Sequence, residues 1–178
     1  MAGLWLDNWR GLRNSALIGG AVAADGKCTA YTTGGQLAYL PSGSFTSPCA
    51  ARIANSRSTS ASGYLTVRFG TSNTAPTQTD RDLGSPITSN LSYVAASVNT
   101  GSWSGNTYTR DYTVTIQNTA TASVTIREYG LFVPAQYGNG SNGDVMLYRE
   151  VLDSPVTVGQ YESATINFSV SMTLGDPV

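Results

Sequence analysis

The sequence predicts an all-β protein, an antiparallel β-sandwich that is jelly-roll-like and carries an extended N-terminal arm. The first observation is the strict alternation of polar and apolar residues from Thr165 to Leu174, a two-residue period that only a pleated strand can use. The second is that about six to eight short segments of this kind are separated by turn residues, with no convincing helix among them. The length of 178 residues suits one core, with an arm over residues 1–62 and a β-sandwich body over residues 63–178.

The first fifteen residues carry an apolar stripe at helical spacing, formed by Leu4, Trp5, Leu6, Trp9 and Leu12. Two tryptophans in so short a segment must be buried somewhere. Either the segment is a helix docked on its own domain, or it inserts into a neighbouring subunit. Burying two Trp side chains would contribute on the order of 4 to 6 kcal/mol before ordering costs. The candidate assembly interface therefore comprises Leu4, Trp5, Trp9 and Arg10.

The rest of the arm is rich in Gly, Ala, Ser and Thr, with a short apolar run at 37–40. This composition predicts short strands joined by turns, or an extended chain. Cys28 and Cys49 enclose a loop of about twenty residues, and a disulfide between them would form in an oxidising compartment.

The body begins with a predicted strand over residues 64–69, which Gly70 ends. A polar loop over residues 71–87 follows and ends in an apolar hook made by Leu83 and Ile87. Two further strands are expected within residues 90–100 and 108–118, joined by a turn with Trp103 at its tip. The short break at residues 118–121 then has the length of a tight hairpin leading to a strand that begins at Val124.

The last three strand segments are expected to form one antiparallel sheet. They cover residues 124–135, 144–158 and 161–174. At ~3.3 Å per residue the final segment would span about 46 Å, more than twice the usual strand. It therefore either bends between two sheets or projects beyond the domain, where it would supply an edge for another chain.

Composition limits the chemistry that the chain can perform. There is no histidine, so the usual general base, the usual zinc ligand and any Ser-His-Asp triad are missing. Charged residues make up 12% and the net charge is −1, which gives no basic field to hold a phosphate backbone. No segment reaches the ~18 apolar residues that a membrane span needs. We expect no catalytic residue, no metal, no cofactor, no nucleic-acid partner and no membrane.

Three weak site patterns have structural alternatives. Asp80 and Asp82 have the spacing of a cation-binding loop, but turn-forming Asx residues explain them better. Glu128 and Glu150 could be the carboxylate pair of a glycoside hydrolase. Each, however, lies directly beside an arginine, Arg127 or Arg149, so cross-strand ion pairing is a simpler explanation than catalysis.

Aromatic residues at predicted turns form the third pattern. Trp103 and Tyr137 are a possible glycan-binding platform, for which the alternative is packing at an interface, since aromatic rings serve both purposes. A receptor- or glycan-binding adhesin is accordingly the alternative function.

Three stretches resemble a family of small virion proteins of tailed bacteriophages. They are GTSNTAPTQTDRDLGSPI at 70–87, IREYGLF at 126–132, and MLYREVLDSPVTVGQYESATINFSVSM at 146–172. The resemblance implies a non-enzymatic accessory structural protein, a β-sandwich that assembles in multiple copies with itself and with other virion proteins on the capsid, neck or tail. Tyr148 stands where the family has a small residue, and the first 60 residues have no counterpart in it.

Overall fold

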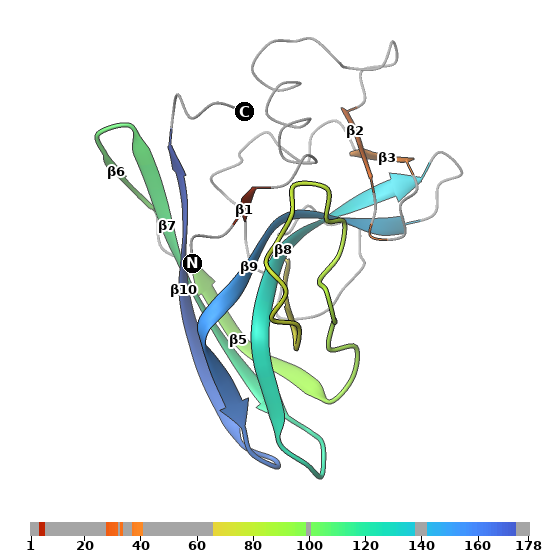
Figure 1. The fold of residues 1–178 in the computed structure, drawn as a ribbon, viewed down its shortest axis with the longest axis vertical. Helices are drawn as coiled ribbons and strands as arrows, with labels where there is room; N and C mark the ends of the chain where they lie inside the picture. Colours follow the sequence, from red (N-terminus) through yellow and green to blue (C-terminus); the bar gives the residue numbers. More distant parts are fainter. Residues whose placement is uncertain are drawn as a thin grey trace.

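The computed structural model describes residues 4–5, 28–31, 33, 37–40, 66–98, 101–137 and 142–173. Within these residues all regular structure is β, as the sequence predicts, and every strand pairing is antiparallel. Figure 1 shows the strands in two layers. They are β1 (Leu4–Trp5), β2 (Cys28–Tyr31), β3 (Leu37–Leu40), β4 (Thr66–Gly70), β5 (Leu91–Val98), β6 (Ser102–Ser104), β7 (Thr107–Asn118), β8 (Val124–Tyr137), β9 (Asn142–Val158) and β10 (Ser163–Thr173).

The strands divide into two sheets. The first sheet has the order β1-β9-β8-β3-β2, with β4 also paired to β8, and the second has the order β10-β7-β5, with β6 also paired to β7. The predicted pairing of the last three segments is therefore half right. β8 pairs with β9, but β10 pairs with β7 in the second sheet, because four residues after β9 turn the chain from one layer into the other.

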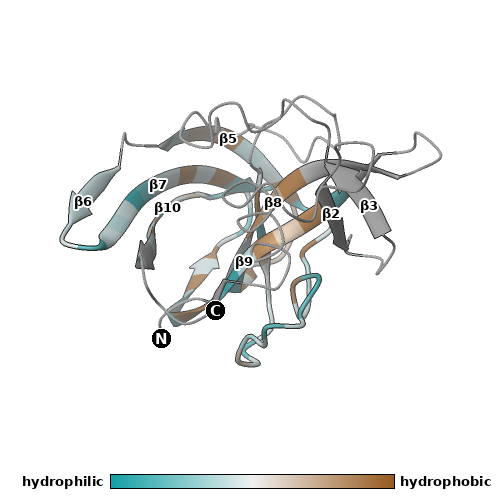
Figure 2. Cartoon of the chain, turned by 90° about the horizontal axis from the view of Figure 1, so that it is seen from above, coloured by the Kyte–Doolittle hydropathy of each residue, from teal (hydrophilic) through white to brown (hydrophobic). Residues whose placement is uncertain are grey.

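One hydrophobic core lies between the two sheets. Phe168 of β10 packs on Tyr129 of β8 with ring centroids 4.2 Å apart, and Phe69 of β4 stacks on Tyr93 of β5 at 6.1 Å. Figure 2 shows the alternation of hydropathy along β7 that places one face of each strand in this core. Two antiparallel sheets that share one core are consistent with the predicted β-sandwich.

The connection from β7 to β8 is a crossover between the sheets and not the predicted hairpin. Asn118 is fully buried and its side-chain amide donates to the carbonyls of Ala122, Val158 and Gly159. Its side-chain oxygen accepts the N–H of Ala120 at 2.9 Å. These bonds satisfy three carbonyls and one N–H of the corner, where the chain leaves one layer and enters the other.

The outer face of the second sheet carries what we call the hydroxyl ladder. Side chains on β7 bond directly to the opposite side chains on β10, in the pairs Thr107–Thr173, Thr109–Ser171, Asp111–Ser169, Thr113–Asn167 and Thr115–Thr165. Asp111 is the one ionisable side chain in this set. The side chains of these pairs are small and polar, and together they carry almost no charge.

Two local predictions are wrong. Leu4 and Trp5 form a strand opposite Arg149 and Tyr148 of β9, so the helix, one of the two alternatives for residues 1–15, is absent at these two positions. Trp103 lies on β6 opposite Tyr108, while the tip of the hairpin is Gly105–Asn106, because Gly105 supplies the positive φ of +57° that a two-residue turn requires. Trp9, Arg10 and Cys49 lie outside the described residues, so their predicted roles stay predictions.

Phe168 tests the shared core because it contacts aromatic rings of both sheets. Phe168→Ala should lower the free energy of unfolding by about 3 to 5 kcal/mol, since it removes packing with Tyr112 and Tyr129 and leaves a cavity. Urea denaturation of the full chain measures this. Thr165→Ala, on the exposed face of the same strand, is the control and should change it little. A loss at Phe168 no larger than that at Thr165 would contradict the shared core.

Candidate functional site

The strongest polar cluster of the described residues is an ion pair on the outer face of the first sheet. Gly130 of β8 lies opposite Arg149 of β9, and Glu128, two residues earlier on the same face, reaches the guanidinium. Arg149 Nε donates to Glu128 Oε2 at 2.7 Å. Glu128 is 0% and Arg149 2% exposed. We call this buried pair the clamp, and it confirms the predicted cross-strand ion pairing of Glu128.

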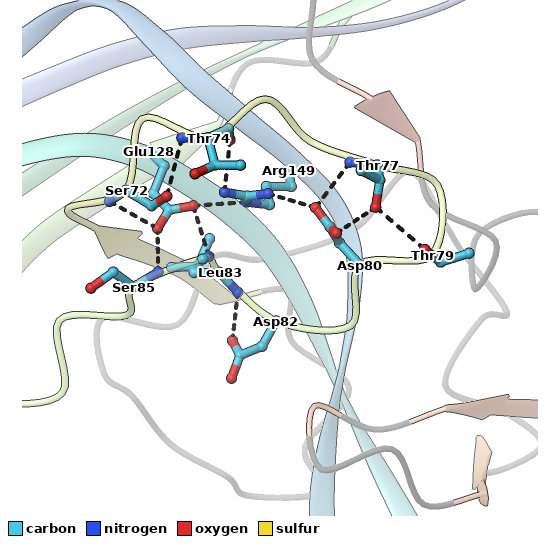
Figure 3. Close-up of polar contacts among 11 residues, drawn as sticks. Ser72, Thr74, Thr77, Thr79, Asp80, Asp82, Leu83, Ser85, Glu128 and Arg149 are labelled. Atoms are coloured by element: carbon cyan, nitrogen blue, oxygen red, sulfur yellow. Dashed lines mark hydrogen bonds and ion pairs between the residues drawn. The ribbon is translucent and has the colours of Figure 1, made fainter.

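Loop 71–87 closes over the clamp (Figure 3). The backbone N–H groups of Ser72 and Ser85 donate to Glu128 Oε1 at 3.3 and 2.8 Å, and that of Gly84 donates to Oε2 at 3.1 Å. Together with Arg149, four donors fill the roughly four acceptor positions of the carboxylate. Protonation of Glu128 by a substrate would therefore require it to give up a hydrogen bond from the loop or from Arg149.

Arg149 binds the other end of the same loop. Its Nη1 donates to Asp80 Oδ2 at 2.5 Å and its Nη2 to the carbonyl of Thr74 at 3.1 Å. Burial disfavours the charge of Arg149, but the bonds to Glu128 and Asp80 outweigh burial and raise its pKa. The guanidinium therefore stays charged while it links the sheet to two points of the loop.

Two glycines let the loop approach this closely. A Cβ on Gly84 would meet Arg149 Nη2 at 2.7 Å, and one on Gly70 would meet the carbonyl oxygen of Ser85 at 2.7 Å. Leu83, the predicted apolar hook, is buried against Phe132 and Met146 in a second small cluster on this face. Loop 71–87 is thus held by hydrogen bonds to the clamp and by one apolar anchor.

Asp80 and Asp82 behave as turn-forming residues. Asp80 accepts the hydroxyl and the N–H of Thr77 at 2.6 and 3.0 Å, and Asp82 accepts the N–H of Leu83 at 2.8 Å. Burial opposes the charge of Asp80, but the bonds from Thr77 and Arg149 outweigh burial and lower its pKa. For Asp82 burial is the larger effect and raises its pKa.

Neither a metal site nor a membrane-spanning helix is found in the part of the chain that the structure describes. Nowhere in it do three or more His, Cys, Asp or Glu side chains gather as ligands for a metal ion. Its described segments also contain no helix long and apolar enough to cross a bilayer.

Glu150 lies on the opposite face of the β8–β9 ribbon from Glu128. It pairs across the strands with Tyr129, whose hydroxyl donates to its carboxylate, and the hydroxyl of Tyr148 donates to Glu150 Oε2 at 2.7 Å. Burial raises the pKa of Tyr129, and the contacts with Tyr148 and Glu150 raise it further. Because the two carboxylates face opposite sides of a sheet, they do not form the catalytic pair considered for a glycoside hydrolase.

The two residues of the possible glycan platform lie on different sheets. Trp103 is 57% exposed on β6, and its ring packs at a tilt on Tyr108, with centroids 5.2 Å apart. Tyr137 ends β8 in the first sheet, where its backbone pairs with Ala38 of β3. Figure 1 shows the β6–β7 hairpin and the far end of β8 pointing away from each other. Among the described residues, Tyr108 is the aromatic residue whose ring contacts Trp103.

Sequence reasoning missed a second ion pair beside the clamp. Arg68 of β4 forms an ion pair with Asp144 of β9 and lies over the ring of Phe132, with its guanidinium carbon 4.5 Å from the centroid. Phe132 and Asp144 lie 64 and 76 positions after Arg68 in the sequence, and no local pattern connects Arg68 with them. The alternation of Arg68 with the core residues Val67 and Phe69 was the available signal, since it places Arg68 on the outer face.

Removal of the negative charge of Glu128 from the clamp should destabilise the protein. Glu128→Gln should lower the free energy of unfolding by about 3 kcal/mol or more, because it leaves Arg149 charged, buried and without its carboxylate. Glu162→Gln, on an exposed turn, is the matched control and should have little effect. Urea denaturation gives the loss, and limited proteolysis should cut loop 71–87 faster in the clamp variant. Equal stability of the two variants would show that the clamp does not hold the loop.

The two aspartates should contribute to acid stability with opposite signs. The pKa of Asp80 is lowered from its ordinary value of 3.8, so ionised Asp80 stabilises the fold above pH 3.8 and this contribution is lost as the pH falls through the folded pKa. The pKa of Asp82 is raised, so stability is gained as the pH falls through its folded pKa toward 3.8. Urea titrations against pH should show a shallower acid loss for Asp80→Asn and a steeper one for Asp82→Asn. The same slope change in both variants would contradict these signs.

Comparison with protein-family models, with curated proteins and with solved structures found no match to this chain. Its function is therefore inferred from its residues and their contacts.

Proposed function

We propose that the chain is a non-enzymatic structural protein of a tailed-bacteriophage virion, present in multiple copies on the capsid, neck or tail. The observation that carries the proposal is the state of Glu128, a buried carboxylate whose acceptor positions are all occupied by a loop and an arginine. A carboxylate that is bonded in this way holds a loop in position, whereas a catalytic carboxylate must be able to reach a proton of its substrate.

The outer surface of the second sheet also suits packing between subunits. The hydroxyl ladder offers small side chains with a single charge, Asp111, so a neighbouring subunit can approach without desolvating a field of charges. The three stretches that resemble virion proteins include both residues of the clamp, Glu128 and Arg149, and the loop 71–87 that closes over it. In this proposal the body is a jelly-roll-like sandwich and the N-terminal arm, with Trp5 and Trp9, attaches it to its neighbours.

The proposal predicts a fixed copy number in purified particles. Quantitative mass spectrometry of particles from the phage or prophage that encodes the chain should find it in stoichiometric amounts relative to the major capsid protein. A few hundred copies would place it on the capsid, and a small multiple of six would place it at the neck or tail. Absence from particles that contain the other virion proteins would overturn the proposal.

Exposed aromatic surface favours a second candidate function, glycan or receptor binding. Trp103 is more than half exposed and lies against Tyr108 at the end of the second sheet, an arrangement on which a sugar ring can stack. Under this candidate, Trp103→Ala should abolish binding on a glycan array. Val94→Ala, an equally exposed apolar residue on β5, should leave binding intact. No binding by the unmodified chain across a broad array would exclude this function.

A further inference from the structure

β10 is an edge strand of unusual regularity. Its eleven residues pair with β7 in eleven consecutive register positions without a bulge, and among the described residues β7 is its one strand partner. An unbroken edge of this length presents a row of backbone donors and acceptors to any strand that approaches it.

The other long edges of the two sheets carry features that discourage such pairing. β9 contains Pro155 within a register shift opposite Ile126 and Glu128, and β1 covers its other part at Tyr148 and Arg149. β5 has a register shift between Tyr93 and Ala95. β4 has only five residues. Within its described residues β10 has no proline, no charged residue and no shift, so these three protections against edge pairing are absent from the strand itself.

The pattern of backbone hydrogen bonds between β7 and β10 identifies which residues of β10 direct their backbone groups away from β7. The N–H of Asn118 donates to the carbonyl of Glu162, in register with the β7–β10 pairs. Because hydrogen-bonded pairs alternate along an antiparallel ladder, even-numbered residues of β10 bond to β7 and odd-numbered residues direct their backbone groups outward. The odd-numbered residues are also those of the hydroxyl ladder, whereas Ile166, Phe168 and Val170 point into the core.

We propose that the open edge of β10 binds the β10 of a second copy of this chain, antiparallel and about a two-fold axis near Phe168, which joins the two second sheets into one continuous sheet. Odd-numbered residues then face odd-numbered residues, so Asn167 lies opposite Ser169 of the second copy. The hydroxyl ladder continues on one face and the apolar residues meet on the other. Backbone hydrogen bonds would form on both sides of the axis, beginning with the two Asn167–Ser169 pairs.

The composition of β10 favours a second copy over a different protein. A two-fold axis brings identical residues near one another, and like charges at such an axis are destabilising. β10 has no charge that would repel its own copy, and none that would select a different partner by charge complementarity. The inference rests on the proposed function in one respect, that the chain assembles in several copies, and it names the surface through which pairs of copies join.

The test introduces like charges at the axis. The full chain should be a dimer by sedimentation velocity in the micromolar range, and Asn167→Lys/Ser169→Lys should raise its dissociation constant about tenfold or more, because lysines then lie directly opposite lysines. The control is Ser92→Lys/Ser97→Lys, which adds the same charge to the exposed face of β5 at the other edge of this sheet. It should leave the dimer unchanged.

Charge complementation separates edge pairing from a loss of folding. Mixed with Asn167→Glu/Ser169→Glu, the lysine variant should form a heterodimer, since each lysine would face a glutamate across the axis. A full chain that stays monomeric, or a lysine variant that dimerises as well as the unmodified chain, would overturn the inference. Either result would leave the copy number in particles as the separate test of the proposed function.

Discussion

The buried ion pair between Glu128 and Arg149 is the interaction on which the arrangement of this protein depends. Loop 71–87 makes up most of the connection from β4 of the first sheet to β5 of the second, so the clamp fixes the path by which the chain passes between the layers. Taking two charges out of water is costly, and the cost is offset only when their remaining hydrogen bonds are made. Backbone groups of the loop make those bonds, and the pair and the loop therefore stabilise each other.

Strand positions could be predicted from the sequence where alternation is strong. The alternation predicts β4, β7, β8 and β9 to within a few residues of their observed bounds, because a two-residue period is a local property of the chain. Partners were harder to predict. Whether β10 pairs with β7 or β9 depends on the corner at Asn118, whose side chain contacts Val158 and Gly159 about forty residues later, and no local pattern encodes that contact.

In the candidate site, too, contacts between neighbouring strands could be predicted from the sequence and contacts with the distant loop could not. The pairing of Glu128 with an arginine followed from their places on neighbouring strands of one hairpin. The contribution of Asp80 did not, since it lies 69 residues from Arg149 and meets it only after the loop has folded over the sheet. Leu4 and Trp5 form a strand where a helix is one of the two expectations, because apolar residues at helical spacing can also belong to a short strand docked on a sheet edge.

The clamp also determines which positions of the loop are free to vary in evolution. Ser72 and Ser85 reach Glu128 through their main chains, a contact that almost any amino acid could make. Gly84 makes the same kind of contact but has an arginine nitrogen where a side chain would begin. Sequences that diverge from this one should therefore drift readily at 72 and 85, keep glycine at 84, and exchange the charged pair only together.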